Sequence, residues 1–250
     1  MYTKMAGRPL NICVYGSSSR HTPEVYLAAA SELGTEMARR GHTCVNGAGA
    51  HGVMGALNRT AKAAGGKVIG VCHRMFVDGE ITGLFEGFEL VLTGGDDLVD
   101  RKRALAERAD CFIALPGGPG TWDELWEVAC ARQLGVGKSG PICLVNTDGY
   151  YDGFVLQLER AHADRLLHKP PKEFLQVCSN PIEALDWCEV HVGEPAGLAD
   201  TVVVGGAAAA AATRGRPAMG PLAWFAMGAA AHLFVKYLLV VAYRSVERKA

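Results

Sequence analysis

A glycine-rich turn carries the residues best suited to chemistry in this 250-residue sequence. Residues 116–124 read PGGPGTWDE, and their three glycines remove side chains where a ligand would approach the backbone. An apolar run at 111–115 precedes the turn, and apolar residues at helical spacing follow it. The first N–H groups of a helix lack partners and carry partial positive charge, so this strand, turn and helix predict a site for an anion such as phosphate.

The same turn also has a purely structural explanation. Thr121 at the helix start and Glu124 three residues later match a capping box, in which each side chain bonds the other's backbone. A tight turn needs one glycine, however, whereas this one has three around Pro119. The two interpretations differ in the role of Glu124, which is a helix cap in one and a chemical group in the other.

Three consecutive cations form a second candidate cluster. Residues 94–97 begin a predicted helix that carries Arg101, Lys102 and Arg103 within its first two turns. The helix macrodipole favours negative charge at this end, so three cations there are unfavourable unless an anion binds beside them. The alternative is three solvated side chains beside neighbouring aspartates.

Two more loops follow predicted strands. Ser17 and Ser18 lie after the strand Asn11–Tyr15, and strand carboxyl ends face the ligand crevice of an open α/β sheet. We therefore expect their hydroxyls to bind a sugar or a base. The alternative is that these hydroxyls only cap the turn. Residues 47–52, GAGAHG, match a dinucleotide fingerprint weakly, because the next strand leads into Cys-His-Arg and not to an acidic residue. His51 has no partner at useful spacing and is predicted to be a loop residue.

The strings PGGPGTWDE and NGAGAHGVMG resemble two motifs of the LONELY GUY family, cytokinin-activating phosphoribohydrolases often mislabelled lysine decarboxylases. The resemblance covers about residues 11–190. It implies a Rossmann-like fold, a homodimer, and neither a metal nor an organic cofactor. The implied reaction cleaves the N-glycosidic bond of a cytokinin riboside 5′-monophosphate, or of AMP, and releases free base and ribose 5-phosphate.

The resemblance also assigns residues. Arg101 and Glu124 are the implied catalytic pair: Glu124 would stabilise oxocarbenium-like charge and orient water, and Arg101 would stabilise the leaving base or the phosphate. The implied substrate-binding residues are Ser17, Ser18, Gly47, Gly49, Glu80, Arg101, Lys102, Gly117, Gly118, Pro119, Gly120, Thr121 and Cys130.

The sequence departs from the family pattern at several of these positions, which leaves base selectivity open. Pro119 stands where plant members usually carry tyrosine, and Cys130 replaces a threonine expected to touch ligand. Leu98 and Val99 stand where Met-His is usual.

Two other functions compete with the hydrolase. A non-catalytic nucleotide-binding module would need the glycines but neither Arg101 nor Glu124 as chemical groups. A lysine decarboxylase would need pyridoxal phosphate and a Schiff-base lysine, and no lysine here has a distinctive context.

Alternation of strands and helices predicts an α/β fold, a doubly wound parallel sheet with helices on both faces, over residues 1–192. The predicted strands are 11–15, 42–46, 67–71, 88–92, 111–115, 141–145 and 174–178. The predicted helices are 23–40, 52–64, one from 94, one from about 121, 151–163, and one capped by Asn180.

Composition narrows the partners and the compartment. A net charge of −1 and a near-neutral pI give no electrostatic footprint for nucleic acid. The eight cysteines form no C-x-x-C pair, and Cys13, Cys44, Cys111 and Cys143 lie in strand-like runs, so we expect reduced core residues. The histidines lack metal-ligand spacing. No signal peptide is recognisable, which predicts a cytoplasmic catalytic domain.

The C-terminal region has a different composition. Residues 193–219 are rich in glycine and alanine and predict a linker. Residues 217–235 contain no Asp, Glu, Lys or Arg, and 237–243 are apolar again, so 220–250 form a hydrophobic tail and a candidate membrane anchor. His232 and Lys236 weigh against a span, and an amphipathic helix covering the globule or lying on a membrane surface is the alternative.

Overall fold

The computed structural model describes residues 8–77, 88–138 and 140–193. The predicted linker and hydrophobic tail, apart from residue 193, lie outside the described residues, as does Glu80. Within the described part, no helix combines the length and the apolar character that crossing a membrane requires.

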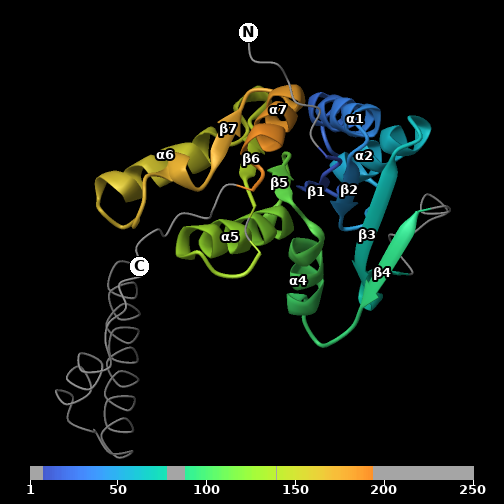
Figure 1. Ribbon diagram of the computed structural model, residues 1–250, viewed down its shortest axis with the longest axis horizontal. Coiled ribbons are helices and arrows are strands. Elements are labelled where there is room, and N and C mark those ends of the chain that lie inside the picture. Colours follow the sequence, from blue (N-terminus) through green and yellow to red (C-terminus); the bar gives the residue numbers. More distant parts are fainter. Residues whose placement is uncertain (1–7, 78–87, 139, 194–250) are drawn as a thin grey trace, which may run out of the picture. The chain divides into compact units, whose positions relative to one another are not determined.

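Seven strands of the described residues form one sheet in which every neighbouring pair is parallel (Figure 1). They are β1 (Asn11–Tyr15), β2 (Thr43–Asn46), β3 (Lys67–His73), β4 (Glu89–Thr93), β5 (Cys111–Ala114), β6 (Ile142–Val145) and β7 (Gln176–Cys178). Their order across the sheet is β4-β3-β2-β1-β5-β6-β7. The predicted parallel α/β sheet is therefore confirmed.

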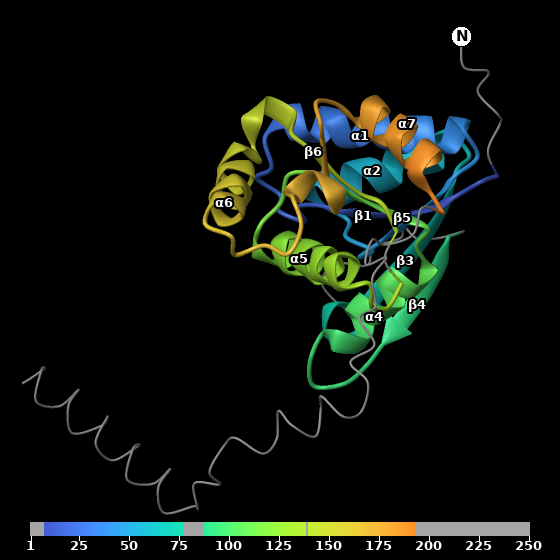
Figure 2. The ribbon, with the colours of Figure 1, turned by 60° about the vertical axis from the view of Figure 1, so that its left-hand side comes forward.

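Helices cover both faces of this sheet (Figure 2). They are α1 (Glu24–Arg39), α2 (Gly52–Ala63), α4 (Val99–Arg108), α5 (Pro119–Leu134), α6 (Asp152–Ala163) and α7 (Pro181–His191), with short 3-10 turns η1 (Arg74–Phe76), η3 (Thr147–Gly149) and η4 (Pro171–Glu173). Residues of α1, α2 and α7 share one core with the sheet, and residues of α4, α5 and α6 share the other.

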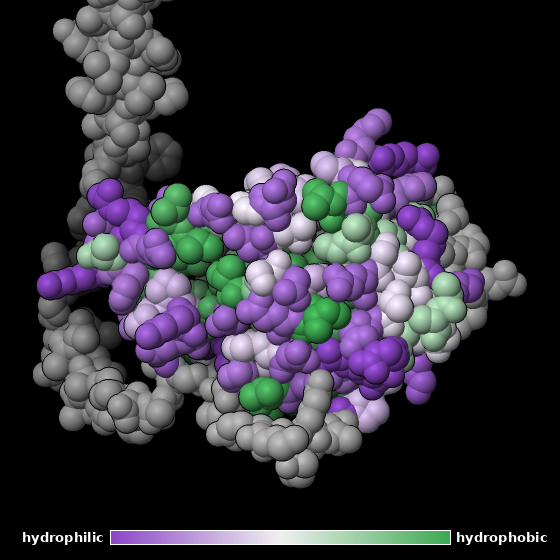
Figure 3. All heavy atoms as spheres, turned by 90° about the horizontal axis from the view of Figure 1, so that it is seen from above, coloured by the Kyte–Doolittle hydropathy of each residue, from purple (hydrophilic) through white to green (hydrophobic). Residues whose placement is uncertain are grey.

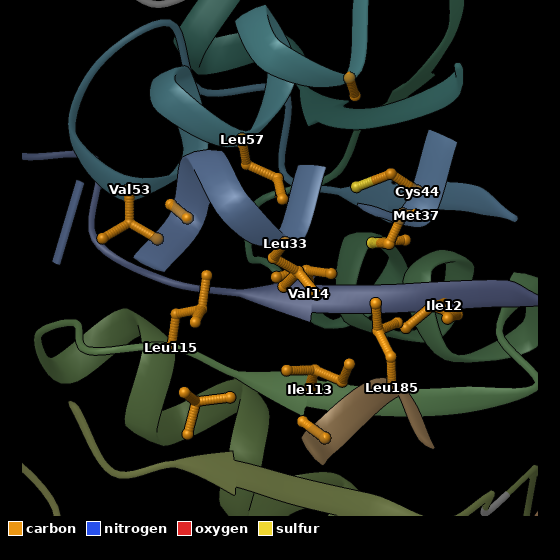
Figure 4. Close-up of a cluster of buried hydrophobic side chains, with 14 of the residues drawn as sticks. Ile12, Val14, Leu33, Met37, Cys44, Val53, Leu57, Ile113, Leu115 and Leu185 are labelled. Carbon is orange, nitrogen blue, oxygen red and sulfur yellow. The ribbon is translucent and has the colours of Figure 1, made fainter. Parts of the chain in front are cut away.

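The outer surface is mixed, with hydrophobic residues interspersed among hydrophilic ones on the face drawn in Figure 3. Among the described residues, the buried apolar side chains form two clusters, one on each face of the sheet. On β1, Ile12 and Val14 point into the core of α1, α2 and α7 (Figure 4), whereas Cys13 and Tyr15 point into the other. Successive side chains of a strand point to opposite faces, so a strand buried on both sides must be apolar throughout.

The four cysteines predicted to be core residues, Cys13, Cys44, Cys111 and Cys143, are all buried and free. Their thiols fill space on the two faces of the sheet as small apolar side chains do.

Two predicted helix starts differ from the structure. The helix α4 begins at Val99 and not at 94, because Gly95 has a φ of 111° and the Asp97 carboxylate accepts a hydrogen bond from the Val99 N–H at 3.0 Å. The helix α5 begins at Pro119, with Gly118 as its N-cap and without a side-chain cap. Proline suits the first helical position because its φ is already fixed near the helical value. The N–H that it lacks would have no partner within the helix at this position.

The order of the strands locates the ligand crevice. The chain runs outward from β1 to β4 on one side of the sheet and from β5 to β7 on the other, so the winding reverses between β1 and β5. Ligands of open α/β sheets bind beyond the carboxyl ends of the strands at such a point. The loops after β1 and β5 meet there, where the Ser17 N–H donates to the Pro116 carbonyl at 3.1 Å.

Candidate functional site

A cavity of about 420 Å³ lies at this reversal point. Three loops and three helices contribute to its wall: the loops follow β1, β3 and β5, and the helices are α2, α4 and α5. The lining residues are Gly16, Ser17, Ser18, Ser19, Met54, Phe76, Leu98, Arg101, Gly118, Pro119, Gly120, Thr121 and Glu124. The structure thus brings together most of the residues that the motifs indicated.

The turn before α5 has two kinds of glycine. A Cβ on Gly118 or Gly120 would meet no protein atom within 4 Å, so the chain leaves space for a ligand there. A Cβ on Gly117 would lie 2.2 Å from the Thr121 Oγ1 atom and 2.9 Å from the Ser17 backbone nitrogen. Gly117 is therefore required by packing within the protein, whereas Gly118 and Gly120 open the first turn of α5 to an anion.

Arg101 and Glu124 meet across the cavity wall although they come from different helices. The Arg101 Nη1 atom lies 2.6 Å from the Glu124 Oε1 atom, and the two side chains are only 12% and 13% exposed. The Arg101 Nε–H also donates to the Val71 carbonyl at 3.2 Å. The capping-box interpretation is wrong, because the Glu124 carboxylate binds the Arg101 guanidinium and the N-cap of α5 is Gly118.

The environment of Glu124 sets its acidity. Burial raises the pKa of the Glu124 carboxyl above its ordinary value, and the Arg101 guanidinium holds back part of that rise. A carboxylate that is poorly hydrated and paired with one cation is available to stabilise a second positive charge that develops beside it.

The three consecutive cations do not gather on one anion site. Arg101 lines the cavity, whereas Lys102 forms ion pairs with Asp123 at 3.1 Å and with Glu127 at 2.6 Å. Arg103 is exposed and pairs with an aspartate on its own helix. Carboxylates of α4 and α5 thus pair with all three cations, and Lys102 does not line the cavity.

Two predicted glycines act from behind the cavity wall. A Cβ on Gly47 would lie 2.2 Å from the Arg101 Nη2 atom, and one on Gly49 would lie 2.7 Å from the Met54 Cε atom. Both glycines therefore support lining side chains. Cys130 is exposed on α5 and does not line this cavity.

The serine loop contributes hydroxyls and backbone to the wall. Ser17 and Ser18 both line the cavity. The Ser17 hydroxyl lies 3.0 Å from the Thr22 hydroxyl and accepts a hydrogen bond from the Ser19 N–H at 3.1 Å. The alternative interpretation also holds for Ser17, since it stabilises its own turn.

Sequence reasoning missed three apolar residues of the cavity lining, Met54, Phe76 and Leu98. Helical spacing places Met54 on α2, but nothing in the sequence indicates that this face of the helix borders a ligand space. Phe76 lies in the turn η1, where the sequence shows no regular pattern. In the sequence, Leu98 stands out only as a departure from the family motif.

A pair of tyrosines that anchor the phosphate loop was also missed. The Tyr150 hydroxyl donates to the Gly117 carbonyl, and the Tyr151 hydroxyl donates to the Leu115 carbonyl at 2.8 Å. The Asn146 side chain accepts a hydrogen bond from the Tyr151 N–H at 2.7 Å and so orients this segment. The only signal in the sequence is the turn composition of residues 146–152.

Known proteins resemble this chain over most of its length. The family model described as "Possible lysine decarboxylase" matches residues 54–188. The cytokinin riboside 5′-monophosphate phosphoribohydrolase LOG5 of Arabidopsis thaliana is 35% identical over 180 residues, covering 72% of this chain and 77% of that protein. The phosphoribohydrolase LOG of Oryza sativa subsp. japonica is 37% identical over 164 residues, covering 66% of each.

Solved structures share the fold. The molybdenum cofactor carrier protein of Chlamydomonas reinhardtii has a TM-score of 0.54 at 25% identity, covering 72% of this chain and 96% of that one. The molybdenum cofactor binding protein of Rippkaea orientalis has a TM-score of 0.54 at 23% identity, covering 73% and 97%. From the family model and the curated relatives, the chain belongs to the LONELY GUY family of cytokinin riboside 5′-monophosphate phosphoribohydrolases.

Proposed function

We propose that this chain hydrolyses the N-glycosidic bond of a cytokinin riboside 5′-monophosphate and releases free base and ribose 5-phosphate. The observation that carries the proposal is the Arg101–Glu124 pair, 2.6 Å apart and directed at the cavity beside the N-terminus of α5. An anion site next to a shielded carboxylate is the arrangement that cleavage of a nucleoside monophosphate requires.

The first turn of α5 binds the 5′-phosphate in this proposal. Gly118 and Gly120 leave the backbone open, and Thr121 adds a hydroxyl to the same wall. Backbone N–H groups at a helix N-terminus favour a phosphate both by hydrogen bonding and by the macrodipole. Fixing the phosphate also fixes the ribose, so that its anomeric carbon lies within reach of Glu124.

Glu124 acts on the reacting carbon. As the C–N bond breaks, its electron pair leaves with the base, and the sugar acquires oxocarbenium-like positive charge. The ionised Glu124 stabilises this charge and orients the attacking water, whose oxygen bonds to the anomeric carbon. One proton of the water is released, and the departing base nitrogen takes up a proton.

Arg101 has two roles in this scheme. It keeps Glu124 ionised despite burial, because its guanidinium opposes the rise in the Glu124 pKa. It also presents further N–H donors to the cavity, where they can bind the leaving base or the phosphate.

The apolar residues of the cavity lining receive the base. Met54, Phe76 and Leu98 offer hydrocarbon surface to a planar ring and to the apolar N6-substituent of a cytokinin. AMP lacks this substituent and is the less favoured substrate. The hydroxyls of Ser17 and Ser18 supply polar contacts to the same ligand.

A second candidate function, a non-catalytic nucleotide-binding module, is favoured by the structural similarity to the molybdenum cofactor carrier protein of Chlamydomonas reinhardtii. A carrier would use the open loop at Gly118 and Gly120 but would not need a carboxylate at the cavity. The Arg101–Glu124 pair distinguishes the two functions.

The deciding experiment measures free base released from isopentenyladenosine monophosphate, AMP and other nucleoside monophosphates. In the full chain, Glu124→Gln should reduce release by a factor of about 100 or more while nucleotide binding persists. The matched control is Glu127→Gln on the same helix, where the carboxylate pairs with Lys102 outside the cavity. Binding without release in the unmodified chain would establish the carrier instead.

Assembly and membrane association are separate proposals. The family resemblance supports a homodimer, which light scattering of purified protein tests directly. The apolar composition of residues 220–250 supports membrane association of an otherwise cytoplasmic catalytic domain, residues 1–192, through the linker 193–219. Flotation with lipid vesicles tests it, and a chain ending at residue 193 should lose flotation.

A further inference from the structure

We infer that a buried pair of asparagines, Asn46 and Asn58, positions Arg101 for the reaction through the loop that joins β2 to α2. The inference rests on the proposed catalytic role of Arg101. Neither asparagine lines the cavity, so both act as positioning residues and not as catalytic ones.

The two amides hold the loop at two consecutive residues, Ala48 and Gly49. Asn46 and Asn58 are fully buried, and the Asn46 Nδ2–H donates to the Asn58 Oδ1 atom at 2.6 Å. The Asn46 Oδ1 atom accepts from the Ala48 N–H at 2.9 Å, and the Asn58 Nδ2–H donates to the Gly49 carbonyl at 3.2 Å. Buried amides are costly unless they are hydrogen-bonded, so these bonds specify a single loop conformation.

The loop is held in a conformation that its sequence does not favour. Ala48 has a φ of 63°, in the left-handed region that residues with a Cβ atom rarely adopt. Such strain persists only where the surroundings fix the backbone, and it is concentrated at functional sites. The hydrogen bond from the Ala48 N–H to Asn46 is the contact that fixes this residue.

The loop in turn forms a wall for the Arg101 guanidinium. A Cβ on Gly47 would lie 2.2 Å from the Arg101 Nη2 atom, so backbone and guanidinium are in close contact. The Val71 carbonyl holds the Nε–H, and Glu124 holds Nη1 at 2.6 Å. The guanidinium is thus confined on three sides, and a shift of the loop would change its distance to Glu124.

Two variants test the inference by independent routes. Gly47→Ala inserts a methyl group against the guanidinium, and Asn58→Ala releases the loop from α2. Each should lower kcat about tenfold or more while the KM for isopentenyladenosine monophosphate changes less than about twofold, because the phosphate loop is untouched. The control is Thr60→Ala, which removes a hydroxyl bonded to carbonyls within α2 and should leave kcat unchanged.

The pH profile provides a readout that a general loss of stability would not move. Displacing Arg101 removes the cation that opposes the raised pKa of Glu124, so the acid limb of kcat should shift to higher pH in both variants. The other groups that act on Glu124 are unchanged in both variants. They are Asp123 on α5, Lys102 on α4, and Cys13 and Tyr15 on β1.

The outcomes separate the inference from the function. Folded Gly47→Ala and Asn58→Ala proteins with unaltered kcat and acid limb would overturn the positioning role, provided that Arg101→Ala abolishes release. If Arg101→Ala itself retains full release, the proposed role of Arg101 fails and the inference fails with it. Should Asn58→Ala not fold, Gly47→Ala decides alone, since its methyl group meets the movable end of a side chain.

Discussion

The Tyr150 hydroxyl donates a hydrogen bond to the carbonyl of Gly117, the residue just before the N-cap of α5. The two residues are 33 positions apart, and the bond connects the turn η3 to the loop that presents the phosphate site. Tyr150 also packs its ring edge-on against Tyr26 and against Tyr151. The backbone of the phosphate loop is therefore held from outside by a side chain that does not line the main cavity.

Tyr150→Phe removes this hydroxyl and keeps the ring packing. A net hydrogen bond contributes about 0.5–1.5 kcal/mol, so we expect the KM for the nucleotide to rise about two- to tenfold as the loop loses its preferred position. The value of kcat should change less, because the contacts that hold Arg101 and Glu124 do not involve Tyr150. Steady-state kinetics checks the split.

Tyr151→Phe is the matched control for Tyr150. Its hydroxyl donates to the carbonyl of Leu115, the buried residue just after β5, and the Tyr151 side chain is fully buried. Leaving that carbonyl unsatisfied should lower the free energy of unfolding by about 1–3 kcal/mol with little effect on KM. Equal kinetic effects of the two changes would contradict a specific role of Tyr150.

Replacing glycine by alanine should have different effects at Gly117 and at Gly118: a loss of stability at the first and a loss of nucleotide binding at the second. Gly117→Ala places a Cβ 2.2 Å from the Thr121 Oγ1 atom and 2.9 Å from a backbone nitrogen, so we expect a loss of about 1–3 kcal/mol of stability. Gly118→Ala meets no protein atom within 4 Å, and its methyl group enters the space proposed for phosphate. It should retain the unfolding transition and weaken nucleotide binding. Denaturant unfolding and calorimetric titration with AMP measure the two effects.

Much of the fold could be predicted because parallel strands buried on both faces leave a strong local signal. The apolar run at 111–115 and the helical spacing after it place β5 and α5 without any tertiary information. The start of α5 was misplaced because Thr121 and Glu124 satisfy a common capping pattern. The local pattern gives no sign that a guanidinium 23 residues earlier competes for the same carboxylate.

The candidate site was predictable only where a motif carries it. The glycines and the pair Arg101–Glu124 belong to such motifs, and the structure brings them to one cavity. Whether a cation faces the cavity or a neighbouring carboxylate depends on which helix packs beside it, as Lys102 shows. Asn46 and Asn58 are twelve residues apart on different elements, so their pairing has no signature in the sequence.

The raised pKa of Glu124 predicts the pH dependence of the reaction. Glu124 acts in its ionised form, so kcat should fall as the pH is lowered through this pKa, at a midpoint above the ordinary carboxyl value of about 4.3. Arg101→Gln removes a cation that lowers the pKa, and the midpoint of its residual activity should move to higher pH. Asp123→Asn removes a neighbouring negative charge and should move the midpoint slightly to lower pH. Shifts of the same sign in both variants would argue against Glu124 as the titrating group.

Phe76 predicts how the enzyme distinguishes bases. Its ring lines the cavity together with the apolar side chains of Met54 and Leu98. Phe76→Ala should lower kcat/KM for isopentenyladenosine monophosphate about tenfold more than for AMP, because apolar contact with a substituent is worth about 1–3 kcal/mol. The ratio of the two kcat/KM values measures this directly. Met75→Ala, one residue earlier and 67% exposed, is the control that should leave the ratio unchanged. An equal loss for both nucleotides would mean that Phe76 supports the shared ribose phosphate and not the base substituent.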